Sequence, residues 1–301
     1  MNRFIKSNYL WVDWITVFDS WKKWPVLWIS ACTHWWEIVW LKVIDYFVNK
    51  FDIKTNLIKW KIIFIVSNIE AYKKYLKLKK KLKWEKLLIE SRYIDENLNR
   101  CCSVNNLINP VSYERKRAKE LEKILKKLDI IIDIHSTTRK SKSILLIKKK
   151  NYDKMKNIFN TDEVYINLVE TAIWKPLIDI TSRWWWIAIW METWCQSDKQ
   201  WYKIWIDNVY RLLVYLGMIG HVNKNILLRE KNKKIFFVNW SIIVRNDKFK
   251  EDRKFWNLNL VKKWSKIAFD WINDIYAKED TYIIMPALHK PWEEYCFLSK
   301  K

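Results

Sequence analysis

The chain has only two glycines among 301 residues, and this shortage constrains its fold more than any other feature. Tight turns need positive φ, which glycine adopts freely and bulky residues do not. A chain of this length would ordinarily carry roughly 21 glycines. It has 23 tryptophans instead, so the two residue types together number 25, close to the ordinary count of glycine alone.

The tryptophans also stand where turns are expected. Residues 184–186 are a tryptophan triplet in a connection, Trp271 precedes Ile-Asn-Asp, and Trp292 follows Pro291. Some bacterial lineages read the UGA codon as glycine, and assigning tryptophan to UGA would write such a sequence. We therefore expect glycine at most or all of the 23 positions in the natural polypeptide. The alternative is a protein that is truly rich in tryptophan.

The formal net charge of +23 would normally suggest nucleic acid or an anionic membrane as a partner. Lysine, isoleucine and asparagine have AT-rich codons, however, and the lysine runs at 73–83 and 148–150 are typical of solvated helix or loop faces. We expect no nucleic-acid partner, and a basic nucleic-acid-binding protein remains the alternative from another functional class.

The cysteines show no CxxC pair and no even framework; they are residues 32, 101, 102, 195 and 296. This pattern predicts free thiols in a reducing compartment. The N-terminus shows no apolar region of a signal peptide, and no run reaches the length of a membrane span. The sequence therefore predicts a cytoplasmic protein without a membrane partner.

Apolar strands alternate with helices over the first 220 residues, which predicts an α/β domain with helices on both faces of its sheet. Short alternating strands follow Gly217 and Gly220 and predict a small all-β domain. The predicted domains are residues 1–220, as the catalytic domain, and residues 221–301. The predicted strands include 61–67, 128–134, 187–191, 234–238, 241–244, 264–269, 281–285 and 294–298; the predicted helices include 38–50, 112–128 and 202–216.

The stretch from Ile29 to Val39 joins an apolar run to a helix-like segment and contains His34 and Glu37. Open α/β sheets bind ligands at such strand ends. The His-x-x-Glu spacing lets an imidazole and a carboxylate point at one spot, and zinc accepts both. The spacing is common by chance, so a capped helix start with a surface Glu is the alternative.

Four stretches in order resemble the succinylglutamate desuccinylase/aspartoacylase family, relatives of the zinc carboxypeptidases. With glycine at positions 35 and 36, the first is similar to the family motif Cys-Thr-His-Gly-Asn/Gly-Glu. The others are Arg92-Tyr93-Ile94-Asp95 with Asn97-Leu98-Asn99-Arg100, then Asp133-Ile134-His135-Ser136-Thr137-Thr138, then Ile189-Trp190-Met191-Glu192-Thr193-Trp194. The main departure is tryptophan at family glycine positions, notably Trp35 and Trp194. The resemblance implies a mixed central sheet flanked by helices, with a small C-terminal all-β domain.

The resemblance implies one zinc ion per chain, with His34, Glu37 and His135 as its ligands. Such a His₂Glu set leaves a fourth position for water, whose pKa then falls toward neutrality. Asp133 lies two residues before His135 on the same strand face and is a candidate to orient a ligand. The alternative for His135 is an ordinary hydrogen-bonded residue at a strand end.

The resemblance also implies the roles of four other residues. Glu192 matches a general base that takes a proton from water, and Arg92 matches an arginine that polarises the scissile carbonyl. Asn99 and Arg100 match residues that grip a substrate carboxylate, a task that suits the guanidinium fork. The alternative for Glu192 is an exposed Glu at a strand end.

Arg183 and Tyr295 resemble further substrate-binding residues. Their alternatives are a surface Arg and a half-buried strand Tyr. His221 and His289 have no motif around them, and we expect them to be structural.

These residues together favour a zinc-dependent amidohydrolase that cleaves an N-acyl amino acid to a carboxylate and a free amino acid. The alternative enzyme is a zinc carboxypeptidase acting on peptides. A small C-terminal β domain favours the first, since it can narrow access to small substrates. The sequence identifies neither the acyl group nor the amino acid, and it leaves the oligomeric state open, a homo-oligomer included.

Overall fold

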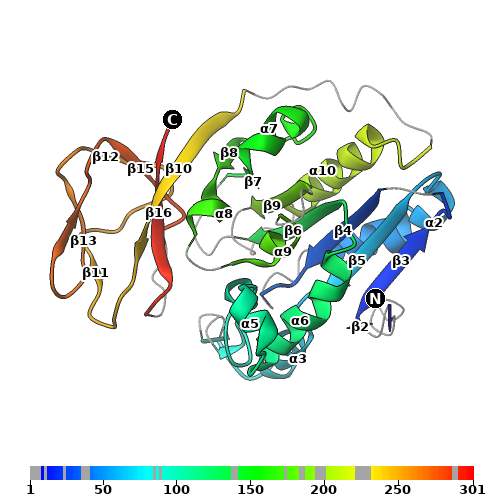
Figure 1. The fold of residues 1–301 in the computed structure, drawn as a ribbon, viewed down its shortest axis with the longest axis horizontal. Coiled ribbons are helices and arrows are strands. Elements are labelled where there is room, and N and C mark those ends of the chain that lie inside the picture. The colour runs from blue at the N-terminus through cyan, green and yellow to red at the C-terminus, as the bar shows by residue number, and fades with distance from the viewer. Residues whose placement is uncertain are drawn as a thin grey trace.

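The structure is a computed structural model that describes residues 8–9, 12–22, 25–34, 41–83, 86–87, 90–136, 142–172, 175–182, 187–193, 201–220, 232–286 and 291–301. Within these residues an eleven-stranded sheet runs through the molecule in the order β12-β15-β16-β10-β8-β7-β9-β6-β4-β5-β3. Helices flank the large sheet. A three-stranded sheet, β11-β13-β14, lies beside the end of the large sheet that is formed by β12, β15 and β16 (Figure 1).

The strands of the large sheet are β3 (Ile15–Asp19), β4 (Val26–Ala31), β5 (Lys61–Val66), β6 (Ile130–Ser136), β7 (Ile144–Ile147), β8 (Glu163–Ile166), β9 (Ile187–Thr193), β10 (Lys234–Ile243), β12 (Asn259–Val261), β15 (Thr281–Ile284) and β16 (Glu294–Lys300). Those of the small sheet are β11 (Lys250–Glu251), β13 (Lys266–Phe269) and β14 (Asp274–Tyr276). A short pair, β1 (Asn8–Tyr9) and β2 (Val12–Asp13), precedes β3.

The helices are α1 (Leu41–Asp45), the π-helical turn η3 (Tyr46–Lys50), α2 (Ile53–Asn56), α3 (Ile69–Leu78), the 3-10 turn η4 (Leu98–Arg100), α5 (Val104–Ile108), α6 (Tyr113–Leu125), α7 (Lys149–Met155), α8 (Leu168–Thr171), α9 (Leu177–Ser182) and α10 (Trp201–Tyr215). The predicted helix 38–50 is therefore two short elements in its described part. The start of α6 is capped by Ser112, whose side chain accepts from the N–H of Arg115.

Four central strands, β5, β4, β6 and β9, run parallel, so their carboxyl ends meet at one edge of the sheet. In this register Ser30 pairs with Asp133, and His135 pairs with Glu192. Neighbouring strands lie about 4.8 Å apart, which brings side chains at these ends within reach of one another. The topology therefore places three of the predicted site segments together.

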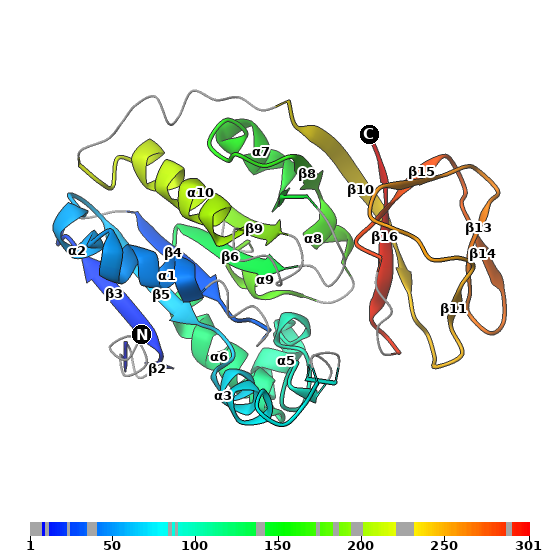
Figure 2. The ribbon, with the colours of Figure 1, turned by 180° about the vertical axis from the view of Figure 1, so that it is seen from behind.

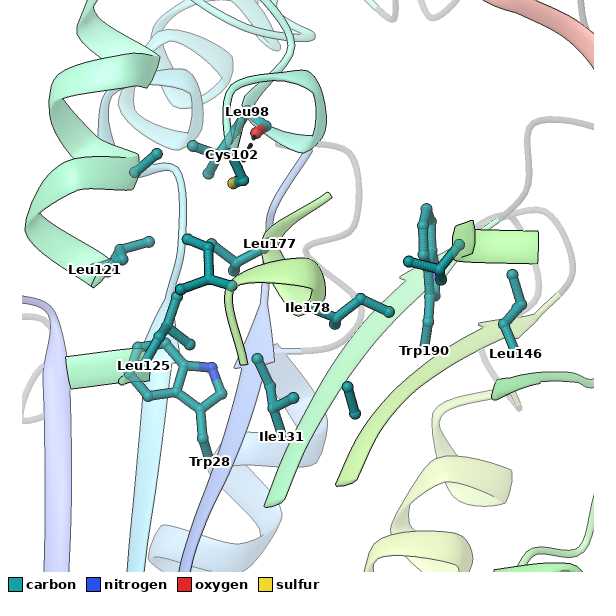
Figure 3. Close-up of a cluster of buried hydrophobic side chains, with 14 of the residues drawn as sticks. Trp28, Leu98, Cys102, Leu121, Leu125, Ile131, Leu146, Leu177, Ile178 and Trp190 are labelled. Atoms are coloured by element: carbon teal, nitrogen blue, oxygen red, sulfur yellow. Dashed lines mark hydrogen bonds between the residues drawn. The ribbon is translucent and has the colours of Figure 1, made fainter. Parts of the chain in front are cut away.

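Successive side chains along each strand point to opposite faces of the sheet, so the buried core forms two layers, one on each face. On β4, Trp28 faces α6 and α9, whereas Leu27 and Ile29 face α1 and α10. Figures 1 and 2 show these two helix pairs on opposite faces of the sheet. Figure 3 shows Trp28 and Ile131, from adjacent strands, packed against Leu125 and Leu177. The prediction of an α/β fold with a mixed central sheet flanked by helices is confirmed.

Strand β10 joins the C-terminal strands to the large sheet. Its first half, Lys234 to Phe237, pairs in parallel with β8, and its second half pairs with β16. The two predicted strands 234–238 and 241–244 are therefore one strand, with a bulge between Val238 and Trp240. The C-terminal strands keep their own apolar core, around Phe255 and Tyr295. The boundary at residue 221 lies outside the described residues and stays a prediction.

No helix in the described part of the chain is long and apolar enough to cross a membrane. Four of the five cysteines are described, and all four are buried free thiols. Burial raises the pKa of the Cys101 thiol far above its usual range, with nearby Glu96 acting in the same direction.

The loop that carries Arg92 is held by a buried carboxylate. Glu114, fully buried on α6, accepts from the N–H groups of Ile94, Asp95 and Glu96 at 2.7, 3.1 and 3.3 Å. It also accepts from Asn68 Nδ2 at 3.2 Å, at the start of α3. The first turn of α6 therefore fixes this loop against the sheet edge.

The described backbone supports glycine at many tryptophan positions. Eleven non-glycine residues among the described ones have positive φ, and six of them are tryptophans: Trp14, Trp21, Trp60, Trp264, Trp271 and Trp292, with φ from 61° to 81°. The left-handed conformation costs a residue with a Cβ about 1 kcal/mol or more, and glycine nearly nothing. The fully buried Trp28 also has an indole N–H without an acceptor among the described residues.

We expect the natural polypeptide to carry glycine at most or all tryptophan positions. Peptide mass spectrometry of the natural protein decides this, because the two residues differ by a whole indole side chain. As a second measurement, a synthetic gene with glycine at these positions should give a soluble, folded protein, and a gene with tryptophan should not. Equal solubility and stability of the two products, or tryptophan in the natural peptides, would refute the hypothesis.

We expect Glu114→Ala to lower the free energy of unfolding by about 3 kcal/mol or more, because it leaves several buried N–H groups without an acceptor. Denaturant unfolding measures the loss. Glu70→Ala is the matched control, since Glu70 lies in an exposed ion pair with Lys73 and should cost less than about 1 kcal/mol. Equal losses in the two variants would show that Glu114 does not hold the loop.

Candidate active site

The edge formed by β4, β6 and the loop 92–100 gathers most of the described residues that the motifs predicted. Its base is Asp133, a fully buried carboxylate on β6. Oδ1 of Asp133 accepts from Ser30 Oγ at 2.7 Å and from Thr33 Oγ1 at 3.1 Å. Both donors belong to β4 or follow it, so Asp133 ties the residues that lead to His34 to the neighbouring strand.

The second oxygen of Asp133 holds His135. Oδ2 lies 2.7 Å from His135 Nε2, and both side chains are buried. A carboxylate only accepts hydrogen bonds, so Nε2 carries the proton and Nδ1 carries the lone pair. Asn99 Nδ2 also lies 3.4 Å from His135 Nε2, but in this tautomer both groups are donors, so we regard that approach as a contact.

His34 is held in the same way. Its Nε2 lies 3.0 Å from Oδ1 of Asn97, which also accepts from the N–H of Asn99 at 3.0 Å. The second bond identifies Oδ1 as the acceptor, so His34 donates through Nε2 and has its lone pair on Nδ1. Metal-binding histidines commonly have their second nitrogen held by such an acceptor. Both imidazoles therefore have the tautomer that a metal ligand needs.

The two imidazole rings lie close together. The ring centroids of His34 and His135 are 5.5 Å apart in an edge-on arrangement. Among the described residues no group of three His, Cys, Asp or Glu side chains gathers to hold a metal ion. The third predicted ligand, Glu37, lies outside the described residues, so the predicted ligand set remains untested.

Glu192 lies on β9 directly beside His135 in the sheet register. Only 3% of Glu192 is exposed, which excludes an ordinary exposed Glu at a strand end. Its Oε1 accepts from the indole N–H of Trp190 at 2.9 Å, and the Trp190 ring lies 4.5 Å from that of His135. A buried carboxylate next to an imidazole is suited to proton transfer.

A buried tyrosine lies near Glu192 on the same face of the sheet. Tyr165 donates to Glu163 Oε2 at 2.6 Å and accepts from Asn257 Nδ2 at 2.7 Å, which links β8 to the C-terminal strands. Burial raises the pKa of Tyr165 well above its usual range, and the Glu163 and Glu192 carboxylates act in the same direction. The phenol of Tyr165 therefore stays neutral beside the site.

The turn η4 carries Asn99 and Arg100. Asn97 caps this turn, and Asn99 Oδ1 accepts from the N–H of Leu177 at 3.2 Å, which fixes the Asn99 amide. Arg100 donates through one terminal nitrogen to Asn99 O at 3.2 Å. Arg92 is half-buried near the start of the same loop. The loop and turn thus bring amide and guanidinium donors to the edge that holds the histidines.

Tyr295 lies elsewhere. Its ring is fully buried in the C-terminal core, and its hydroxyl donates to Glu251 Oε2 at 2.6 Å. Its strand neighbour Glu294 instead lies 3.1 Å from a terminal nitrogen of Arg100, because successive residues of a strand face opposite sides. The structure thus brings Glu294, and not Tyr295, to Arg100. Arg183 lies outside the described residues.

Sequence analysis missed four residues here: Asn97 as the acceptor for His34, Glu114, Glu294 and Tyr165. Asn97 stands out in the sequence only as part of a motif, and Glu114, Glu294 and Tyr165 have the sequence surroundings of ordinary helix or strand residues. Their partners lie far away in the chain, so local patterns carry no signal of them. Only the capping geometry of Asn97 before Leu98-Asn99-Arg100 could have been anticipated.

Comparison with known proteins supports the family predicted from the motifs. Residues 23–161 match the model of the succinylglutamate desuccinylase/aspartoacylase catalytic domain. No curated protein matches the chain.

Solved structures share the fold along nearly the whole chain. The succinylglutamate desuccinylase from Chromobacterium violaceum is 14% identical, with a TM-score of 0.67, and the match covers 96% of this chain and 89% of that one. Murine aminoacylase 3 is 13% identical, with a TM-score of 0.62, and the match covers 93% of this chain and 96% of that one. The ectoine utilization protein EutE (DoeB) from Ruegeria pomeroyi is 12% identical, with a TM-score of 0.66, and the match covers 95% of this chain and 88% of that one. The motifs and the domain match agree: residues 23–161 resemble the catalytic domain of the succinylglutamate desuccinylase/aspartoacylase family, and the whole chain shares the fold of solved structures from that family.

Proposed function

We propose that this protein is a zinc-dependent amidohydrolase that cleaves an N-acyl amino acid to a carboxylate and a free amino acid. The family consists of hydrolases that remove acyl groups, which supports the reaction class. The observation that carries the proposal is the pair His34 and His135. Their rings lie 5.5 Å apart, both have the tautomer of a metal ligand, and Glu192 lies beside one of them.

The donor chemistry of these residues fits a zinc ion. His34 and His135 would hold it through Nδ1, since Asn97 and Asp133 engage their Nε2 atoms. We propose Glu37 as the third ligand, from the His-x-x-Glu spacing. When bound, zinc would act as a Lewis acid on the scissile carbonyl and lower the pKa of water toward neutrality.

Glu192 is the proposed general base. It is 3% exposed and adjoins His135, so its carboxylate can accept a proton from the attacking water. The same proton can then pass to the leaving nitrogen of the amino acid. One carboxylate would thus serve both halves of the reaction, as base and then as acid.

The loop residues provide the proposed contacts to substrate. Arg92 would polarise the acyl carbonyl and stabilise the charge that develops on its oxygen. Asn99 and Arg100 would bind a polar group of the amino acid part. The amide of Asn99 is already oriented by Leu177, so little of its conformational freedom is lost on binding.

A carboxypeptidase acting on peptides is the second candidate among enzymes. The contact of Glu294 with Arg100 favours the deacylase, because it brings the C-terminal strands against the turn that carries Arg100, where they would limit the size of a substrate. A polypeptide substrate needs an open approach. We further propose that the protein acts in the cytoplasm, which its buried free thiols support, and that nucleic acid is not its partner.

We expect the purified natural protein to hold about one zinc ion per chain, since three protein ligands and a water complete a tetrahedral site. Metal analysis measures the content. The double variant His34→Ala, His135→Ala should hold almost none, whereas His34→Ala alone should retain weakened binding. Stoichiometric zinc in the double variant would overturn the ligand assignment.

We expect Glu192→Gln to keep its zinc but to lose about two to four decades of kcat, the usual contribution of a general base. Glutamine has the shape of glutamate and cannot take the proton. Turnover of an N-acyl amino acid, measured together with metal content, tests this. Near-normal turnover with zinc bound would mean that another group accepts the proton.

A further inference from the structure

Three polar side chains join β8 to the C-terminal strands. Glu163 and Tyr165 lie on β8, and Asn257 lies just before β12. The N–H of Met285 donates to Asn257 Oδ1 at 2.8 Å, so the Nδ2 end of this amide faces Tyr165. The phenol accepts from Nδ2 at 2.7 Å and donates to Glu163 at 2.6 Å. The donors and acceptors of this junction are therefore fully matched.

Asn257 also holds two strained residues. Leu258, which follows it, has a φ of 65°, and Met285, which donates to it, has a φ of 50°. Left-handed backbone is unfavourable for such side chains and persists only where the surroundings fix it. Both side chains pack against the core that contains Tyr165, and not against the separate core of the C-terminal strands. Asn257 therefore fixes the place where the two cores meet.

This junction lies close to the strand that supplies a partner to Arg100. Strands β15 and β16 are antiparallel, with Ile284 opposite Phe297, so the end of β15 at Met285 lies beside the start of β16 at Glu294. Glu294 Oε2 is 3.1 Å from a terminal nitrogen of Arg100, and the Glu294 side chain is 2% exposed. Asn257 thus holds the same end of the C-terminal strands that reaches Arg100.

The two histidines are held in a different way. Asp133 binds His135, and Asn97 binds His34, so these bonds involve only residues that precede β7 in the chain. A loosened junction at the C-terminal strands should therefore disturb Arg100 and leave the histidine pair in place.

We propose that Asn257 is a positioning residue for substrate binding. Through Tyr165 it holds the C-terminal strands, and these strands hold Glu294 against the Arg100 guanidinium. The inference rests on the proposed deacylase function, in which Arg100 binds the amino acid part, and it adds a residue that acts through Arg100. Loss of the bond to Tyr165 should weaken substrate binding and spare the chemical step.

N-succinylglutamate and N-acetylaspartate are the probes, used with the zinc-loaded natural protein. We expect Asn257→Ala and Tyr165→Phe each to raise KM by about 5- to 30-fold for a probe that is hydrolysed, with kcat within about twofold and zinc content unchanged. Tyr113→Phe is the matched control. The Tyr113 hydroxyl also accepts a hydrogen bond, from the N–H of Glu70, but it joins α3 to α6, so its loss should leave KM unchanged.

The Glu294→Gln background tests whether Asn257 acts through Glu294. Residues that act through one another are not additive, so Tyr165→Phe should raise KM much less in this background than in the natural protein. A purely structural role would give the same rise in both. An equal rise in the two backgrounds, or a lowered kcat with KM unchanged, would overturn the inference.

Amide hydrogen exchange makes the test independent of turnover. The N–H of Arg100 donates to Asn97 O at 2.8 Å within η4. We expect Tyr165→Phe to speed the exchange of this N–H by about 5- to 30-fold, because η4 loses a fixed partner, and Tyr113→Phe to leave it unchanged. If neither probe nor any other N-acyl amino acid is hydrolysed, the proposed function fails. Unchanged exchange at Arg100 in Tyr165→Phe would separately refute the role of Asn257.

Discussion

The candidate site depends on one buried carboxylate, that of Asp133. One oxygen accepts from Ser30 and Thr33, and the other accepts from His135. The first pair of bonds fixes the end of β4, which leads into His34; the third sets the tautomer of His135. A fully buried carboxylate with three charge-assisted hydrogen bonds is strongly constrained. The relative position of the two histidines therefore follows from the parallel pairing of β4 with β6, from Asp133, and from Asn97, which holds the His34 ring.

The parts of the site that sequence analysis predicted share one property: each lies at the end of an apolar strand. His34 follows β4, and His135 and Glu192 lie near the ends of β6 and β9, so strand pattern and motif pointed to the same edge. The remaining parts depend on long-range contacts. Glu114 binds the loop 94–96 from a helix, and no local pattern distinguishes this buried carboxylate from the solvated charges that surround it in the sequence.

The C-terminal strands show how strand alternation decides which of two neighbouring residues faces the turn that carries Arg100. The resemblance pointed to Tyr295, and the strand at 294–298 was predicted from its pattern. The strand exists as β16, but its alternation sends Tyr295 into the C-terminal core and Glu294 to Arg100. The predicted strands 234–238 and 241–244 merge into β10 for a related reason. A bulge at Val238 and Trp240 interrupts the hydrophobic pattern without interrupting the strand.

Among the described site residues, Glu192 and His135 contact a tryptophan, whereas the hydrogen bonds that hold the two histidines do not involve one. The Trp190 ring lies tilted against that of His135, with the ring centroids 4.5 Å apart, and its indole N–H donates to Glu192. Glycine at position 190 would remove that ring and that donor, which would open space beside the imidazole and leave Glu192 freer to accept a proton. The bonds of His135 to Asp133 and of His34 to Asn97 involve no tryptophan side chain. The hydrogen bonds that set the tautomers of the two histidines therefore do not themselves require tryptophan, whereas the surroundings of Glu192 do include one.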